Sequence, residues 1–144
     1  MKGIVQIVIL SRDRAEYLKQ TIDSVLNQKT SIEGIEIIVS DNSNKDDVME
    51  MIHQDYSSNN IKYIRRSPSV SLMKHFQLII SECRNEYTVL FHDDDIMHPN
   101  YIETMLPYMQ KEGVAAVGCN SFIFNNDISK TVGEMHKFKS VKTF

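Results

Sequence analysis

The sequence has no tryptophan, and its 144 residues include only five glycines, three prolines and two cysteines. So little glycine and proline excludes a collagen-like or low-complexity chain, and two cysteines are too few for a disulfide scaffold. No segment reaches the roughly 18 consecutive apolar residues that a membrane-spanning helix needs. With 42% hydrophobic and 24% charged residues, the composition is that of a globular protein of about one domain.

Charge and cysteine content limit the partners and the cellular setting. The formal net charge of −3 at pH 7 is too small to imply a charged partner, and no long basic stretch suggests nucleic-acid binding. Cys83 and Cys119 lie in apolar contexts without metal-ligand spacing. We therefore expect both to be reduced core residues of a cytoplasmic protein. Peripheral association with the inner face of a membrane stays open.

Short apolar runs alternate with segments of helical periodicity along the chain. The expected strands comprise residues 4–10, 35–40, 61–64 and 87–91, followed by a fifth strand over 114–119 and its continuation over 121–124. The expected helices begin near Asp13, Asp46, Leu72 and Pro99. This order predicts an α/β fold, a three-layer α/β/α sandwich with a mainly parallel, Rossmann-like sheet. We expect residues 1–125 to form this core, and the polar tail 126–144 has no assignable pattern.

Two expectations concern how the helices begin and which faces they bury. Asp13 and Glu16 have the spacing of a capping box for the first helix. Lys74 and His75 lie on the polar side of the third helix, where a solvated face is the expected structure. Apolar residues on the other side recur with helical spacing and predict its buried face, namely Leu72, Phe76, Ile79, Ile80 and Cys83.

Acidic residues follow three of the first four expected strands. Asp13 follows the first strand, Asp41 the second, and the acidic triple 93–95 the fourth. Since the carboxyl ends of parallel strands form the ligand-binding edge of such folds, we expect the three groups to share one crevice. Two structural alternatives stay open, a helix cap for Asp13 and an Asx-turn for Asp41.

The acidic triple is the strongest single signal in the sequence. Three neighbouring carboxylates repel one another unless a cation neutralises them. A magnesium or manganese ion takes oxygen ligands and is often shared with substrate phosphates, so one carboxylate here is enough for a metal site. Because alternate residues of an extended chain point the same way, His92 and Asp94 should share a face while Asp93 points elsewhere. The structural alternative is a solvated turn that leads into the helix at Pro99.

Taken in order, three stretches resemble the motifs of the family 2 glycosyltransferases, which have the GT-A fold. "LSRDRAEYLKQTIDSVLNQ" (10–28) is similar to the family's proline–threonine–tyrosine–asparagine–arginine motif and first helix, and "IIVSDNSNKD" (37–46) to its aspartate–aspartate–glycine–serine motif. "HDDDIMHP" (92–99) is similar to its aspartate–x–aspartate–aspartate metal motif. The resemblance covers roughly residues 4 to 110. It departs from the family where Asp13 replaces asparagine, and where Ser40 and His92 each replace an aspartate.

The resemblance implies a role for each matched position. Asp41 would recognise the base of a nucleotide-sugar donor, with Ser11 and Asp13 beside it in the nucleoside pocket. His92 would contact the ribose or support the metal, and Asp93 would occupy the variable middle position of the donor-binding motif. Asp94 would be the direct ligand of Mn²⁺ or Mg²⁺. An imidazole at position 92 favours Mn²⁺ over Mg²⁺.

The resemblance also implies an activity. It is metal-dependent, inverting transfer of a sugar, with a UDP-sugar favoured as donor, to a hydroxyl of a saccharide or lipid-linked acceptor, in surface polysaccharide synthesis. Members of the family are generally longer, and their remaining half carries the acceptor pocket and the catalytic base. We therefore expect a truncated chain that binds donor with little transfer, and an exposed sheet that favours a homodimer. The alternative is a non-catalytic nucleotide-sugar-binding or assembly module. A phosphotransfer receiver domain is disfavoured, because its acidic pair would follow the first strand.

Overall fold

The structure is a computed structural model that describes residues 4–125, 129 and 131–135. The chain divides into two compact units, Met1–Glu103 and Thr104–Phe144. The predicted boundary between a core and a tail after residue 125 stays a prediction. Among the described residues, no helix is both long enough and apolar enough to cross a membrane.

The first unit is built around a four-stranded parallel sheet with the strand order β3-β2-β1-β4. These strands are the first four that the sequence predicts, and every boundary lies within one residue of the expected one. They are β1 (Val5–Ser11), β2 (Glu36–Asp41), β3 (Ile61–Arg65) and β4 (Tyr87–His92). All seven residues of β1 are buried, as expected for a central strand that is covered on both faces.

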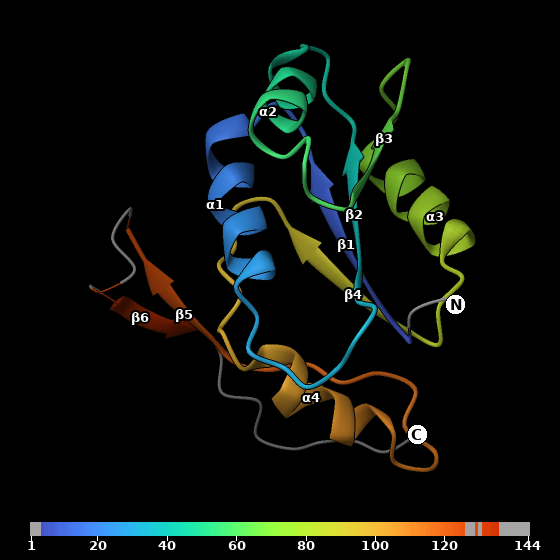
Figure 1. Ribbon diagram of the computed structural model, residues 1–144, viewed down its shortest axis with the longest axis vertical. Coiled ribbons are helices and arrows are strands. Elements are labelled where there is room, and N and C mark those ends of the chain that lie inside the picture. The colour runs from blue at the N-terminus through green and yellow to red at the C-terminus, as the bar shows by residue number, and fades with distance from the viewer. Residues whose placement is uncertain (1–3, 126–128, 130, 136–144) are drawn as a thin grey trace. The chain divides into compact units, whose positions relative to one another are not determined.

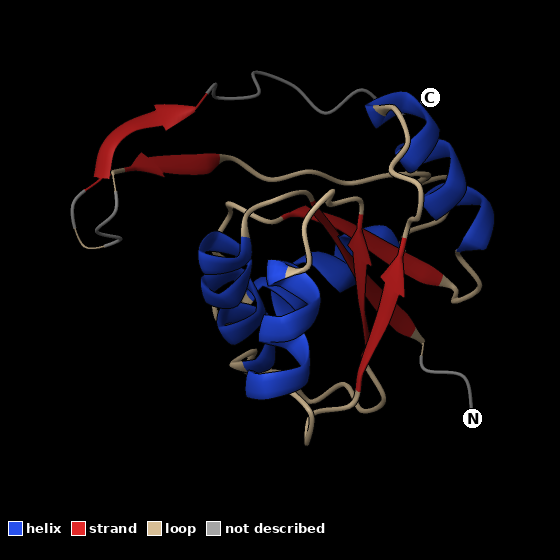
Figure 2. Ribbon diagram, turned by 90° about the horizontal axis from the view of Figure 1, so that it is seen from above, coloured by secondary structure: helices blue, strands red, loops and turns tan. Residues whose placement is uncertain are grey.

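Helices cover both faces of this sheet, which confirms the predicted α/β/α layering. Figures 1 and 2 show α1 (Ala15–Leu26) and α2 (Asp47–Asp55) on one face and α3 (Leu72–Glu82) on the other. Val8 of β1 packs with Ile79 of α3 in one buried cluster. Since successive residues of a strand point to opposite faces, Ile7 and Ile9, which are fully buried, face α1 and α2.

The predicted buried face of α3 is wrong in part. Ile79 and Phe76 pack on the sheet as expected, but Leu72 is 61% exposed and Ile80 is 62% exposed. His75, expected on the solvated side, is buried instead. His75 lies one turn before Ile79 and has a hydrogen-bond partner in β2. A polar side chain with such a partner can be buried, and the apolar pattern alone does not reveal this.

The second half of the predicted pattern agrees less well with the structure. α4 (Tyr101–Met109) begins after Pro99 as expected, and Gly113, at φ 78°, follows its end. The predicted strand over 114–119 does not form, and Cys119 is exposed rather than part of a core. Its small residues have weak strand propensity. β5 (Ser121–Phe124) instead pairs antiparallel with β6 (Thr131–Met135), which lies in the tail that had no assignable pattern.

Candidate functional site

The predicted site residues follow the carboxyl ends of β1, β2 and β4, which are neighbours in the sheet. The strand register pairs Ser11 with Asp41 and Leu10 with His92. The three loops therefore start side by side, as the strand order predicted. The contacts that each side chain makes were only partly predicted from the sequence.

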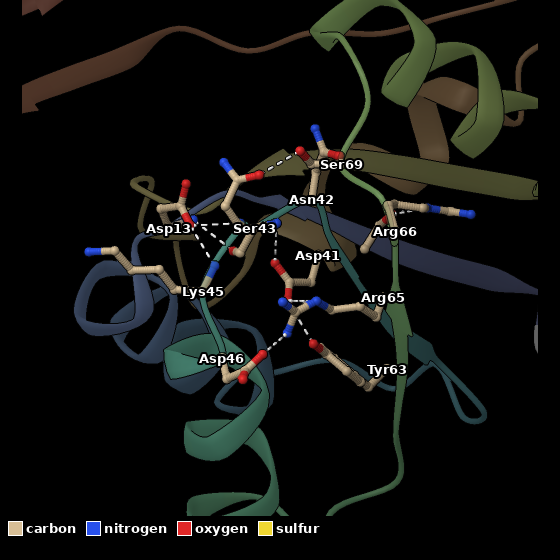
Figure 3. Close-up of polar contacts among 12 residues, drawn as sticks. Asp13, Asp41, Asn42, Ser43, Lys45, Asp46, Tyr63, Arg65, Arg66 and Ser69 are labelled. Atoms are coloured by element: carbon tan, nitrogen blue, oxygen red, sulfur yellow. Dashed lines mark hydrogen bonds and ion pairs between the residues drawn. The ribbon is translucent and has the colours of Figure 1, made fainter.

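Asp13 connects the loops after β1 and β2. Its φ is 54°, a left-handed conformation that aspartate tolerates better than most residues. Its backbone N–H donates to the Ser43 hydroxyl at 2.7 Å, and its carboxylate accepts from the backbone N–H groups of Asn44 at 2.9 Å and Lys45 at 3.3 Å (Figure 3). The expected capping box is absent, because Arg14 is the N-cap of α1 and makes no side-chain cap bond.

Asp41 is fully buried, and both of its carboxylate oxygens have partners within the protein. Oδ1 accepts from the Ser43 backbone N–H at 2.8 Å, which is the Asx-turn that had been left open. Oδ2 accepts from the Tyr63 hydroxyl at 2.6 Å and lies 3.9 Å from Nε of Arg65 (Figure 3). Burial, together with the bond to Asp41, raises the pKa of Tyr63 to about 12. Asp41 therefore joins β2 to β3.

Sequence reasoning missed the side chains that β3 contributes to this edge. Arg65 also lies 3.0 Å from Asp46, at the start of α2. Arg66 forms a two-pronged ion pair with Glu82 of α3, at 2.8 and 2.6 Å. The signal that could have found Tyr63 and Arg65 is their position on a strand that neighbours β2 in a parallel sheet.

The three carboxylates of the acidic triple lie in different environments. Asp93 is buried and accepts from the Arg12 backbone N–H at 3.0 Å. Burial raises the pKa of Asp93. Asp94 is half-exposed and accepts from Nη1 of Arg14 at 2.7 Å, while the same nitrogen lies 3.5 Å from Asp93. Burial and the neighbouring Asp94 charge raise the pKa of Asp95.

Arg14 supplies the positive charge that the triple requires in this structure, since it reaches two of the three carboxylates. The sequence carried a signal for it, because Arg14 matches the arginine at the end of the family's first motif. The alternation expected for His92 and Asp94 does not continue past His92, because the strand ends there and a turn begins. As a result His92 and Asp93, rather than His92 and Asp94, line the same cavity.

Side chains of α1, and of Gln28 just after it, hydrogen-bond to the backbone of the acidic loop. The Thr21 hydroxyl donates to the Asp95 carbonyl at 2.8 Å, and the Met97 N–H donates to the Ser24 hydroxyl at 2.9 Å. The Gln28 side-chain amide donates to the His98 carbonyl at 2.7 Å. These bonds connect the backbone that carries the triple to α1 and to the residues just after it.

A cavity of about 180 Å³ lies where these loops meet, and we call it the strand-end cavity. It contains three of the predicted site residues, Ser11, His92 and Asp93, whereas Asp13, Asp41 and Asp94 lie outside its lining. Two imidazoles, two arginines and one carboxylate give it a polar wall. Its lining residues are Leu10, Ser11, Arg12, Arg14, Asn42, Leu72, His75, His92 and Asp93.

Asn42 ties the strand-end cavity to the segment before α3. Its side chain donates to the Val70 carbonyl at 2.9 Å and accepts from the Val70 N–H at 2.8 Å. The hydroxyl of Ser69 donates to the side chain of Asn44 at 2.6 Å (Figure 3). This places the first turn of α3 beside the cavity.

Comparison with known proteins defines the family. Residues 6–142 match Glycosyl transferase family 2, and the chain belongs to this family. It is 31% identical over 112 residues to the Bifunctional glycosyltransferase pgtA of Dictyostelium discoideum, covering 74% of this chain and 14% of that protein. It is 28% identical over 111 residues to the Abequosyltransferase RfbV of Salmonella typhimurium, covering 76% of this chain and 33% of that protein. The chain thus spans a third or less of these relatives.

Solved structures confirm the GT-A type of fold. The mannosyltransferase PcManGT from Pyrobaculum calidifontis, in complex with GDP-Man and Mn²⁺, aligns with a TM-score of 0.66 at 10% identity, over 78% of this chain and 34% of its own. S. aureus TarS 1-349 in complex with UDP-GlcNAc aligns with a TM-score of 0.63 at 14% identity, over 76% of this chain and 31% of its own. The chain therefore has the GT-A type of fold, and it aligns with about a third of each of these structures.

Proposed function

We propose that this chain carries the nucleotide-sugar donor site of a metal-dependent glycosyltransferase, with a UDP-sugar as the favoured donor. The observation that carries the proposal is the strand-end cavity, in which Ser11, His92 and Asp93 meet two arginines at the carboxyl ends of β1 and β4. Ligands of open α/β sheets bind at this edge. Two solved structures of the same fold carry GDP-Man and UDP-GlcNAc, which supports a donor of this class.

The size of the cavity indicates which part of the donor it holds. Small-molecule sites usually exceed about 300 Å³, so a cavity of about 180 Å³ holds only part of a nucleotide sugar. We assign the nucleoside to it. Ser11 and His92 hydrogen-bond to the ribose or base, and the half-exposed Arg12 and Arg14 bind the diphosphate outside. Asp13 supports this wall through its bonds to the loop after β2.

Asp41 remains our candidate for recognition of the base. Its Oδ2 is the atom that accepts from the Tyr63 hydroxyl at 2.6 Å. Because Asp41 is fully buried beneath this contact, a base N–H can reach the oxygen only if the hydroxyl moves aside, so base recognition by Asp41 includes a movement of Tyr63. Without that movement, Asp41 acts by holding the end of β2 in place.

The residues present fit a divalent cation bound by one carboxylate. Asp94 is half-exposed and its carboxylate is hydrogen-bonded by Arg14, so a cation can replace the guanidinium as its partner. Within residues 4–125, 129 and 131–135, no group of three or more acidic, histidine or cysteine side chains is arranged to hold a metal. Mg²⁺ and Mn²⁺ commonly use one or two carboxylates with phosphate oxygens and water. When bound at Asp94, the ion would supply positive charge to the donor diphosphate.

In the proposed reaction an acceptor hydroxyl attacks the anomeric carbon with inversion, and the nucleoside diphosphate leaves. Arg12 and Arg14 stabilise the charge that develops on the leaving diphosphate. A general base takes the proton of the hydroxyl, and we assign this role to no residue of the chain.

A saccharide or lipid-linked acceptor, a role in surface polysaccharide synthesis and a place at the inner face of the membrane are further proposals. The relatives include a Chondroitin synthase of Escherichia coli, 27% identical over 83% of this chain and 18% of that protein, which supports a saccharide acceptor. Exposed apolar residues on α3, Met73 and Ile80, support association into a homodimer.

Calorimetric titration tests the proposal. UDP, GDP and dTDP are each added to the chain with Mn²⁺, with Mg²⁺ and with a chelator. We expect UDP to bind most tightly, and only with a divalent ion present. Binding of no nucleotide under any condition would refute the donor site and would leave a module that retains the family motifs without the ligand.

A further inference from the structure

A buried histidine lies in the wall of the strand-end cavity and is not explained by the proposed donor contacts. His75 is only 3% exposed, on the first turn of α3. Its Nε2 lies 2.8 Å from the hydroxyl oxygen of Ser40, which is fully buried near the end of β2. The ring therefore contacts Ser40 on one edge and lines the cavity with another part, since Ser40 itself does not line it.

The hydrogen-bond pattern around Ser40 fixes the protonation of this ring. Nε of Arg66 donates to the Ser40 hydroxyl oxygen at 3.2 Å, and the guanidinium is held in turn by Glu82 at 2.8 and 2.6 Å. Arg66 has no hydrogen-bond acceptor to offer, so the hydroxyl hydrogen of Ser40 is left for Nε2 of His75. The ring then accepts at Nε2 and carries its proton at Nδ1, an assignment made from the hydrogen-bond network.

Burial and two neighbouring cations favour the neutral form of the ring. Burial lowers the pKa of His75, and the cations of Arg66 and Arg12 lower it further. The anions of Asp41 and Glu82 act in the opposite direction but do not outweigh these effects. His92 and Asp93 face the same cavity from the end of β4. A neutral ring suits the nucleoside that we assign to this cavity, because Arg12 and Arg14 supply the positive charge for the diphosphate outside it.

We propose that His75 is a positioning residue of the nucleoside cavity, whose bond to Ser40 locks the first turn of α3 onto the end of β2. This inference rests on the proposed donor site. Leu72 is the first residue of α3 and lines the same cavity, so loss of the lock would let this wall move. The cavity then has to be ordered when the nucleotide binds, and ordering of side chains and backbone on binding weakens affinity.

The test compares four single variants of the chain, and the double variant Ser40→Ala with His75→Leu, by calorimetric titration with UDP and Mn²⁺. His75→Leu keeps an apolar bulk but removes the acceptor, and Ser40→Ala removes the donor. His75→Gln restores a side-chain oxygen that can accept from Ser40. Gln77→Leu changes an exposed polar residue of the same helix and is the matched control.

We expect His75→Leu and Ser40→Ala each to weaken UDP binding about tenfold, as for loss of one well-placed hydrogen bond. The double variant should be no weaker than either single one, because both changes remove the same bond. His75→Gln should bind within about threefold of the wild type, and Gln77→Leu should be unchanged. A purely structural role would lower the melting temperature without this pattern of rescue.

Three results would overturn the inference. The first is a folded His75→Leu chain that binds UDP as the wild type does. The second is a folded His75→Gln chain that binds no better than His75→Leu. The third is additivity of the Ser40 and His75 changes. If His75→Leu does not fold, UDP binding by Ser40→Ala and His75→Gln still tests the role of His75. A wild-type chain that binds no UDP refutes the donor site itself, and this inference with it.

Discussion

The bond between Tyr63 and Asp41 gives a sharp prediction about the stability of the sheet edge. Tyr63→Phe removes only the hydroxyl that donates to Oδ2 of Asp41 at 2.6 Å. The carboxylate stays fully buried, and Nε of Arg65, at 3.9 Å, is too distant to replace the bond. The variant thus leaves a buried acceptor without a close donor on that oxygen.

The expected cost follows from the charge of the acceptor. A hydrogen bond to a charged group contributes about 1.5 to 3 kcal/mol, and a buried group left without its partner loses this in full. We therefore expect Tyr63→Phe to lower the free energy of unfolding by about 2 kcal/mol. For a domain of this size, that corresponds to a fall in the melting temperature of roughly 6 to 8 °C.

The assay is urea unfolding at pH 7, with thermal unfolding beside it. Tyr17→Phe is the control, because Tyr17 is half-exposed on α1 and loses the same atom. The stability of Tyr63→Phe should also depend on high pH differently from that of the wild type. In the folded chain the pKa of Tyr63 rises from its ordinary value of 10.0 to about 12. The unfolded chain thus loses this proton first, and wild-type stability falls between about pH 10 and pH 12 by an amount that the variant lacks.

A Tyr63→Phe chain as stable as Tyr17→Phe would refute this reasoning. It would mean that water or Arg65 satisfies Asp41 without the hydroxyl. In that case the carboxylate would be open to a ligand, and a movement of Tyr63 would not be needed for base recognition.

Two further predictions concern α3. Arg66 holds the pKa of Glu82 below its ordinary value of 4.5, so the pair stabilises the fold above about pH 4.5 and this stabilisation is lost as the pH falls through the lowered pKa. In urea unfolding, Glu82→Gln should therefore lose less stability than the wild type between pH 7 and pH 3. An equal loss in both chains would mean that the Arg66–Glu82 pair does not stabilise the fold. Ile79→Ala should cost about 2 to 5 kcal/mol, whereas Ile80→Ala, at a position 62% exposed, should change stability by less than about 0.5 kcal/mol. Equal losses in unfolding experiments would mean that α3 buries the face that its apolar pattern predicted.

The sheet could be predicted from the sequence because its signal is local. The runs at β1 and β2 are short, rich in β-branched residues and bounded by polar turns, and such runs form strands buried on both faces. Their order along the chain then predicts the parallel sheet and the edge at which the loops gather. The pattern fails at 114–119, where small residues resemble a buried strand in hydrophobicity but lack strand propensity.

The side-chain contacts of the site could not be predicted, because they join segments far apart in the sequence. Asp93 is held by the backbone of Arg12, and His75 is buried through a bond to Ser40. Hydrophobic periodicity assigns a histidine to the solvated face, since it contains no information about a partner on another strand. The family resemblance implied that Asp94 is the direct metal ligand, and this stays a prediction for a carboxylate that is half-exposed and paired with Arg14.

The central claim is that the chain binds a nucleotide through a divalent ion held by Asp94. The most direct measurement is calorimetric titration of UDP with Mn²⁺ into the wild type, Asp94→Asn and Asp55→Asn. Asp55, exposed on α2, is the control that removes the same charge away from the cavity. We expect metal-dependent binding by the wild type and Asp55→Asn, and binding at least about tenfold weaker by Asp94→Asn. Equal binding by all three would contradict the claim.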